Sequence, residues 1–126
     1  MLSVAVVGCA AAHKPTPERI SSANYGIYAE NHRSTVDDYM KKILFDPYSA
    51  VYDDWRGPIK GYFSDKTGSY FGYRVCVEIN SKNRTGRYVG SQRSYFLLKE
   101  GSVEQMEGGY EYGTIGAYMV KNSCNF

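Results

Sequence analysis

Few residues of this chain have a type and spacing that could do catalytic chemistry. It has two histidines, His13 and His32, and neither lies in a segment with strand periodicity. Nucleophilic catalysis of the Ser-His-Asp or Cys-His kind needs a base beside its nucleophile, so the sequence gives it little support. Two distant carboxylates, such as Asp54 and Glu78, could serve a small hydrolase. The simpler interpretation of Glu78 is a cross-strand ion pair, and we expect no enzyme.

Metal and cofactor chemistry is not indicated either. The sequence has no Cys-x-x-Cys pair and no Cys/His cluster with the spacing of zinc ligands. Its 13 glycines are scattered, and none precedes the Lys-Ser/Thr pair of a phosphate-binding loop. We therefore expect no metal site and no cofactor.

Cys9 stands apart from the other two cysteines. It follows the uncharged, almost wholly apolar residues 2–8 and precedes three alanines, an order similar to a bacterial lipobox, in which the cysteine is lipidated. Residues 1–8 lack the positive n-region of a signal peptide, so we interpret them as the remnant of a signal that starts upstream. The alternative is a short buried strand with a core cysteine.

Cys76 and Cys124 remain as a candidate pair. A domain that faces the periplasm or the outside lies in an oxidising compartment, where such a disulfide forms. Cys76 lies on the opposite side of its predicted strand from Val75 and Val77, which suits a bridge to a C-terminal tail crossing the outer face. We expect a Cys76–Cys124 disulfide. Pairing of one cysteine with another protein is the alternative.

The 126 residues suffice for one domain. We interpret residues 9–30 as a lipidated cysteine with a flexible tether, because Pro15 and Pro17 disfavour helix and the following residues show no periodicity. Residues 31–126 then form the single folded domain. No apolar run approaches the ~20 residues of a membrane-spanning helix.

One amphipathic helix is predicted at the start of this domain. Ser34 is expected to cap its first turn, and Asp46-Pro47 to end it. Its apolar residues recur at helical spacing on one face, and they are Val36, Tyr39, Met40, Ile43 and Leu44.

Strands are predicted after this helix. The clearest covers residues 70–79, where apolar and mixed positions alternate. Others are expected at 59–64, 93–99 and 103–106, with a hairpin turn at Glu100-Gly101 and a further strand at 117–120, whereas Asp53-Asp54-Trp55 is turn-like. The order predicts an α+β fold, in which one helix packs on a mostly antiparallel sheet of four or five strands.

Tyrosine and arginine side chains suggest a contact surface. The chain has 13 tyrosines, which could be half-buried sheet residues, protein-contact residues or a stacking platform for single-stranded nucleic acid. The net charge of +2 argues against nucleic acid. We expect contact with an envelope protein or an incoming protein. The candidate residues are Tyr70, Arg74, Asn83, Arg84, Arg87, Tyr88 and Arg93.

Two stretches resemble a known family. Residues 44–50, LFDPYSA, follow the predicted helix, and residues 77–83, VEINSKN, continue to Gly86 and Tyr88. Both are similar to motifs of small, largely uncharacterised bacterial and phage-associated envelope proteins, many of them predicted lipoproteins. The resemblance implies the fold and the envelope, and it implies no activity.

Together these observations predict a lipid-anchored bacterial envelope protein. We expect it in the outer membrane, facing the periplasm or the cell surface, as a non-catalytic protein-binding module. The first alternative is an inhibitor or immunity-type lipoprotein that inserts a loop, residues 81–91, into the cleft of a cell-wall hydrolase. The small hydrolase with distant carboxylates is the second.

Overall fold

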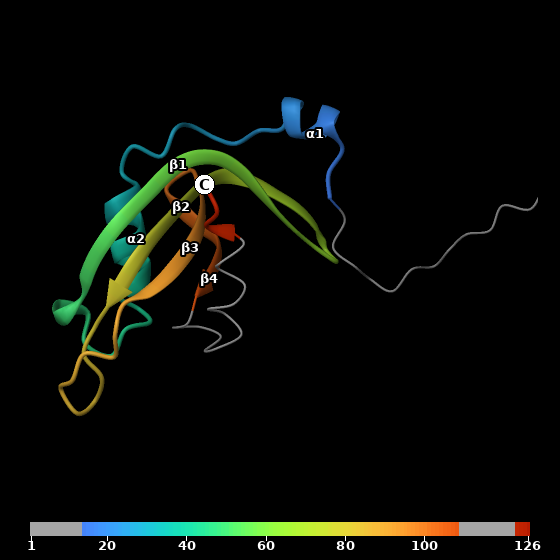
Figure 1. Cartoon of the computed structure of the whole chain (residues 1–126). Coiled ribbons are helices and arrows are strands. Elements are labelled where there is room, and N and C mark those ends of the chain that lie inside the picture. Colours follow the sequence, from blue (N-terminus) through green and yellow to red (C-terminus); the bar gives the residue numbers. More distant parts are fainter. Residues whose placement is uncertain (1–13, 109–122) are drawn as a thin grey trace, which may run out of the picture.

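Four strands form one antiparallel sheet at the centre of the protein (Figure 1). The computed structural model describes residues 14–108 and 123–126. Neighbouring strands in the sheet are also neighbours in the chain, because each strand pairs with the one that follows it. The strands are β1 (Val51–Asp65), β2 (Gly68–Asn80), β3 (Gln92–Lys99) and β4 (Ser102–Gly108).

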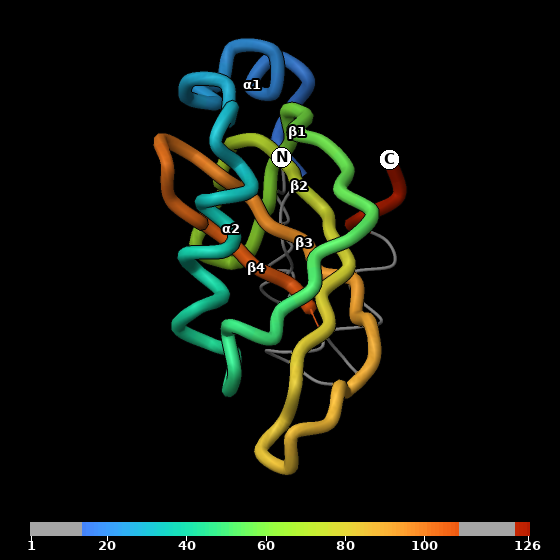
Figure 2. Tube along the Cα trace, turned by 90° about the vertical axis from the view of Figure 1, so that its left-hand side faces the viewer, coloured from blue at the N-terminus to red at the C-terminus, as the bar shows by residue number. Residues whose placement is uncertain are grey.

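One helix of nine residues, α2 (His32–Met40), packs against one face of this sheet, which we call the helix face (Figures 1 and 2). This arrangement confirms the predicted α+β fold. The main core lies between the two layers, and its buried side chains are Val36, Met40, Leu44, Val75, Val77, Ile79, Phe96, Leu98 and Met106.

The predicted ends of this helix were wrong. The N-cap residue is Asn31, and Ser34 lies inside the helix, where its hydroxyl donates to the Asn31 carbonyl (3.0 Å). The helix ends at Met40 because the following backbone tightens into turns, in which Lys42 and Ile43 donate three residues back. Leu44 donates to the Met40 carbonyl and stays in the core.

A short helix, α1 (Pro17–Ser22), precedes the domain core. The expectation that proline excludes helix from this segment was wrong, since Pro17 occupies the first turn, where its missing N–H is not needed. Thr16 caps the helix by accepting from the Arg19 amide (3.2 Å). Beyond the helix, Tyr25 is buried edge-on against the Phe71 ring of β2.

β1 begins eight residues before the predicted strand. It includes the stretch Asp53-Asp54-Trp55, expected as a turn, because register shifts between Asp53 and Ile59 absorb extra residues without ending the pairing with β2. Asp54 adopts a φ of 51° there.

The expected hairpin turn between β3 and β4 is confirmed. Glu100 and Gly101 have φ values of 51° and 77°, as a two-residue turn of the primed type needs. Lys99 pairs directly with Ser102 across this turn. The strand expected at 117–120 lies outside the described residues.

The face opposite α2, which we call the outer face, is covered in part by residues 123–126 at the C-terminus (Figure 2). Cys76 of β2 and Cys124 form the expected disulfide, with their Cα atoms 5.9 Å apart. Tyr95 and Leu97 of β3 are buried beside it, and Phe126 packs against this second cluster. Burial raises the pKa of the Tyr95 hydroxyl above its usual range. In the described part of the chain, no helix is long and apolar enough to cross a membrane.

Breaking the Cys76–Cys124 disulfide is expected to lower the free energy of unfolding. The bridge joins residues 48 positions apart, and the chain-entropy model gives a crosslink of this span about 4 kcal/mol. Urea unfolding of the same protein before and after reduction measures the difference, with Cys9→Ser in both samples to keep that thiol out of the comparison. Equal unfolding midpoints would contradict this expectation, as would two free thiols at these positions in non-reducing mass spectrometry.

Candidate binding surface

The binding residues predicted from the sequence fall into two groups at different places. Tyr70, Arg74 and Arg93 belong to strands, with side chains on the outer face. The others, Asn83, Arg84, Arg87 and Tyr88, lie in the loop between β2 and β3. This loop projects past the end of the sheet, away from the β1–β2 hairpin (Figure 1). Cys9 lies outside the described residues.

The strand group is occupied by contacts within the protein. The Arg74 guanidinium donates to the Lys60 carbonyl (3.3 Å) and lies 4.7 Å from the centroid of the Phe126 ring. The Tyr70 hydroxyl is hydrogen-bonded to the Thr67 hydroxyl (2.7 Å). These side chains therefore help to hold the sheet and the C-terminal residues together, and they do not form a free Tyr/Arg face.

Arg93 brings Asp54 and Glu78 together. Its Nη2 donates to both carboxylates, at 2.7 Å to Asp54 and 3.1 Å to Glu78. Glu78 lies directly across from Arg93 in the β2–β3 register, which confirms the expected cross-strand ion pair. The hydrogen bond from Arg93 and the nearby Arg56 lower the pKa of Asp54. The contacts of Arg93 with both carboxylates, and of Arg56 with Asp54, give Asp54 and Glu78 a structural role as members of an ion-pair cluster.

Metal ligation has no candidate among the residues that the structure describes, since no group of three or more His, Cys, Asp or Glu side chains there could hold an ion.

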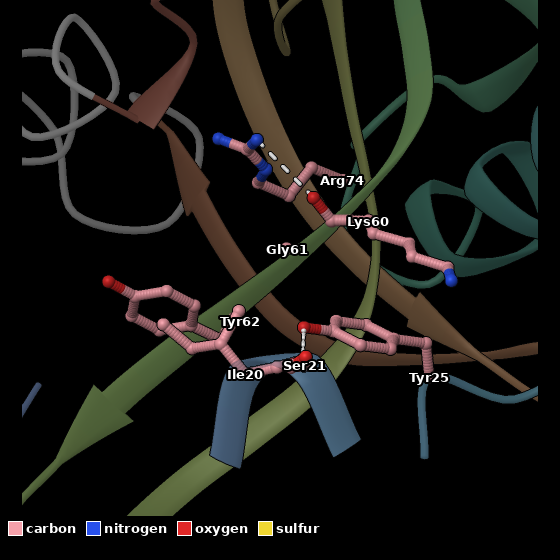
Figure 3. Close-up of a pocket in the computed structure, with 7 residues that line it drawn as sticks. All are labelled: Ile20, Ser21, Tyr25, Lys60, Gly61, Tyr62 and Arg74. Atoms are coloured by element: carbon pink, nitrogen blue, oxygen red, sulfur yellow. Dashed lines mark hydrogen bonds between the residues drawn. The ribbon is translucent and has the colours of Figure 1, made fainter. Parts of the chain in front are cut away.

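An open groove lies between α1 and β1 (Figure 3). Two cations line it, Lys60 and Arg74, together with the hydroxyl-bearing Ser21, Tyr25 and Tyr62. Figure 3 shows the Lys60 ammonium and the Arg74 guanidinium extending to opposite sides of β1. The two positive charges do not converge on one ligand position, so the groove lacks the geometry of an anion site.

The β2–β3 loop, residues 81–91, is held in one shape by Asn83. The Asn83 Oδ1 accepts three hydrogen bonds, from the Thr85 amide (3.0 Å), the Thr85 hydroxyl (2.7 Å) and the Arg87 amide (3.2 Å). Lys82 and Tyr88 form an isolated bridge across the base of the loop. Asn83 therefore positions the loop rather than acting as a contact residue.

This loop is also fastened to the segment that follows α2. The Ser49 hydroxyl accepts from the Lys82 amide (2.8 Å), and the Tyr88 hydroxyl donates to the Ser49 carbonyl (2.9 Å). The Arg84 guanidinium lies 5.3 Å from the centroid of the Phe45 ring. The two stretches that carry the predicted family resemblance thus touch each other through the contacts of Ser49.

Exposed apolar side chains gather where these two segments meet. Tyr48 is 100% exposed and Phe45 is 61% exposed, although both are large aromatic residues. Three more large side chains of this region are also exposed. We define the tip patch as these five apolar residues and the cations beside them: Phe45, Tyr48, Val51, Tyr88 and Val89, with Lys82, Arg84 and Arg87.

The sequence analysis missed Phe45, Tyr48, Val51 and Val89 as surface residues. Phe45 and Tyr48 do carry a signal, because they flank Asp46-Pro47, where the helical periodicity ends and no strand alternation has begun. An aromatic residue in such a turn belongs to no predicted core face, and its exposure could have been expected.

Comparisons with protein-family models, with curated protein sequences and with solved structures found no significant match for this chain. The resemblance to envelope lipoproteins therefore stays a prediction from its two motifs.

Replacing Asn83 with alanine is expected to loosen the loop, because it removes the acceptor of three hydrogen bonds. Amide hydrogen exchange, followed by NMR, should become about fivefold faster at Thr85 and Arg87, since a lost hydrogen bond is worth about 1 kcal/mol. Asn83→Asp is the matched control: it keeps an oxygen acceptor and should retain slow exchange. Rapid exchange of both amides in the unchanged protein would show that Asn83 does not order the loop.

Proposed function

We propose that this protein is a non-catalytic protein-binding module and that the tip patch is its contact surface. The observation that carries this proposal is the full exposure of Tyr48 beside the exposed Phe45 and the stacked Arg84. Tyr and Arg are enriched among residues that dominate protein interfaces. A cluster of exposed apolar side chains costs solubility, so a functional contact is the simplest reason to keep one.

The order of the loop supports the same proposal. Its shape is fixed by Asn83 and by the contacts with Ser49, so binding would not have to pay the entropy of ordering it. The contact surface proposed here differs from the sheet face favoured by the sequence. On that face Arg74 and Arg93 have partners within the protein, and the C-terminal residues lie over part of it.

We further propose that the module is a bacterial envelope lipoprotein anchored through Cys9 in the outer membrane, facing the periplasm or the cell surface. The Cys76–Cys124 disulfide supports this location, because such bridges persist in oxidising compartments and are rare in the cytosol.

Lipidation of Cys9 is checked by metabolic labelling with a palmitate analogue in a bacterial host, using a gene that supplies an upstream signal peptide. We expect label on the unchanged chain and none on Cys9→Ser, because the lipid is attached through the sulfur atom of Cys9. Equal labelling of both, or labelling of neither, would reject the lipoprotein while leaving the contact surface open to its own test.

An inhibitor or immunity-type lipoprotein is the second candidate function. The observation that favours it is the projecting loop, residues 81–91, braced by hydrogen bonds within itself and to Ser49. Such a loop suits insertion into the cleft of a cell-wall hydrolase. This candidate uses the same tip patch and differs only in the identity of the partner.

The contact surface is tested by photo-crosslinking in living cells. A photoreactive phenylalanine analogue is placed at Tyr48 or at Val89, both in the tip patch, and at Ile27, a matched control that is 74% exposed and lies outside it. We expect one adduct of the same mass from both patch positions and none from Ile27. A hydrolase in the adduct would select the inhibitor, and any other envelope protein the general module. No adduct from the patch, or the same adduct from Ile27, would reject the proposed contact surface.

A further inference from the structure

We infer that the tip patch recognises an acidic surface of a partner protein. This inference rests on the proposed function and adds the chemistry of the partner. The tip patch holds three cations that form no ion pair among the described residues, Lys82, Arg84 and Arg87. Exposed aromatic rings lie under two of these cations, and hydrogen bonds fix the shape of the loop that carries them.

The loop carries the whole positive excess of the chain. Residues 81–91 contain Lys82, Arg84 and Arg87 and no acidic residue, which gives +3. The full chain has a net charge of +2, so the other 115 residues sum to 2 − 3 = −1. The positive charge is therefore concentrated at one end of a nearly neutral body, which favours an acidic partner for that end alone.

These three cations are not neutralised within the described residues. The ion pairs there involve other basic residues, Lys41, Arg56 and Arg93, each with aspartate or glutamate. Residues 45–51 contain one acidic residue, Asp46, whose backbone carbonyl accepts the Ser49 hydroxyl. Asp46 forms no salt bridge in the part of the chain that the structure describes. Carboxylates of a partner protein could therefore form ion pairs with Lys82, Arg84 and Arg87 without displacing a carboxylate of this chain.

Aromatic rings hold two of the cations in place. The Arg84 guanidinium lies over Phe45 at 5.3 Å, and the Lys82 ammonium lies over Tyr88 at 5.5 Å, both measured to the ring centroid. The guanidinium of Arg84 presents a planar fork of N–H donors, two of which a single carboxylate can accept. The rings themselves supply apolar contact area between the charges.

The direction in which the patch points favours a protein over the lipid of the anchoring membrane. The described chain begins at Lys14, which lines one cleft together with Asp65 and Gly68 at the β1–β2 turn. Lys14 therefore lies beside this turn. The loop follows the other end of β2, whose 13 residues run for about 40 Å along the strand. Five residues from Cys9 to Lys14 reach at most about 18 Å. A membrane that holds Cys9 therefore faces the end opposite the tip patch.

The test uses the full chain, with Cys9→Ser in every sample, and a synthetic peptide of eight glutamates interrupted by two tyrosines. NMR titration should shift the signals of residues 82–89 and 45–51, and binding should weaken as salt rises. Arg84→Gln/Arg87→Gln should weaken binding of the glutamate peptide about fivefold or more, since each substitution removes one charge contact with a glutamate.

The matched control is Arg19→Gln/Arg33→Gln, which removes two exposed arginines that also lie over aromatic rings, Phe71 and Trp55. It should change binding less than about twofold.

Three results would overturn the inference. One is equal binding of a peptide with glutamine in place of glutamate. Another is an equal loss of binding in the two double variants. The third is tighter binding at the patch of phosphatidylglycerol vesicles or of a thymidine oligonucleotide, which would make the partner a lipid surface or a nucleic acid. Crosslinking separates this from the proposed function: an adduct from Tyr48 that persists undiminished in Arg84→Gln/Arg87→Gln keeps the module and rejects acidic recognition, whereas no adduct in either background rejects the module itself.

Discussion

The structure depends on burial of both faces of the central strand pair, β2 and β3. Val75, Val77 and Phe96 are fully buried on the helix face, and Cys76 and Leu97 are fully buried on the outer face. Each of the aliphatic and aromatic side chains among them contributes about 1.5–3 kcal/mol when removed from water. One helix can cover only one face of an antiparallel sheet, so the second face needs its own cover. The C-terminal residues provide part of that cover, and the Cys76–Cys124 bridge keeps them there.

This second layer decides which residues remain free for a partner. Arg74 lies over Phe126, and Arg93 joins two carboxylates across strands, so the arginines of the outer face act within the protein. Arg84 and Arg87 follow the end of β2, in the loop that neither α2 nor the C-terminal residues 123–126 cover. An arginine within β2 or β3 therefore contacts other parts of the protein, whereas an arginine in the loop between these strands is free to contact a partner.

Ser49 connects the free end of the molecule to its body. Its hydroxyl donates to Asp46 and accepts from the Lys82 amide, while its carbonyl accepts the Tyr88 hydroxyl. The short helix η1 (Pro47–Ser49), which contains this serine, leaves Tyr48 facing solvent. One residue thus fixes both components of the tip patch, the aromatic segment after α2 and the basic loop after β2.

The sequence by itself determined the fold class, the clearest strand and the β3–β4 hairpin, because each of these follows from short-range periodicity or turn chemistry. It predicted the cysteine pair from the side of the strand on which Cys76 lies, with pairing to another protein left as the alternative. It did not determine the start of β1, where register shifts carry a turn-like stretch into the sheet, nor α1, where Pro17 occupies a position that tolerates it. Only the tertiary structure decided that the side chains of Tyr70, Arg74 and Arg93 have partners within the protein. It also decided that Phe45 and Tyr48 are exposed. The contacts that join Ser49 to the loop span 33 and 39 residues, and a local pattern carries no information about side chains that meet across such separations.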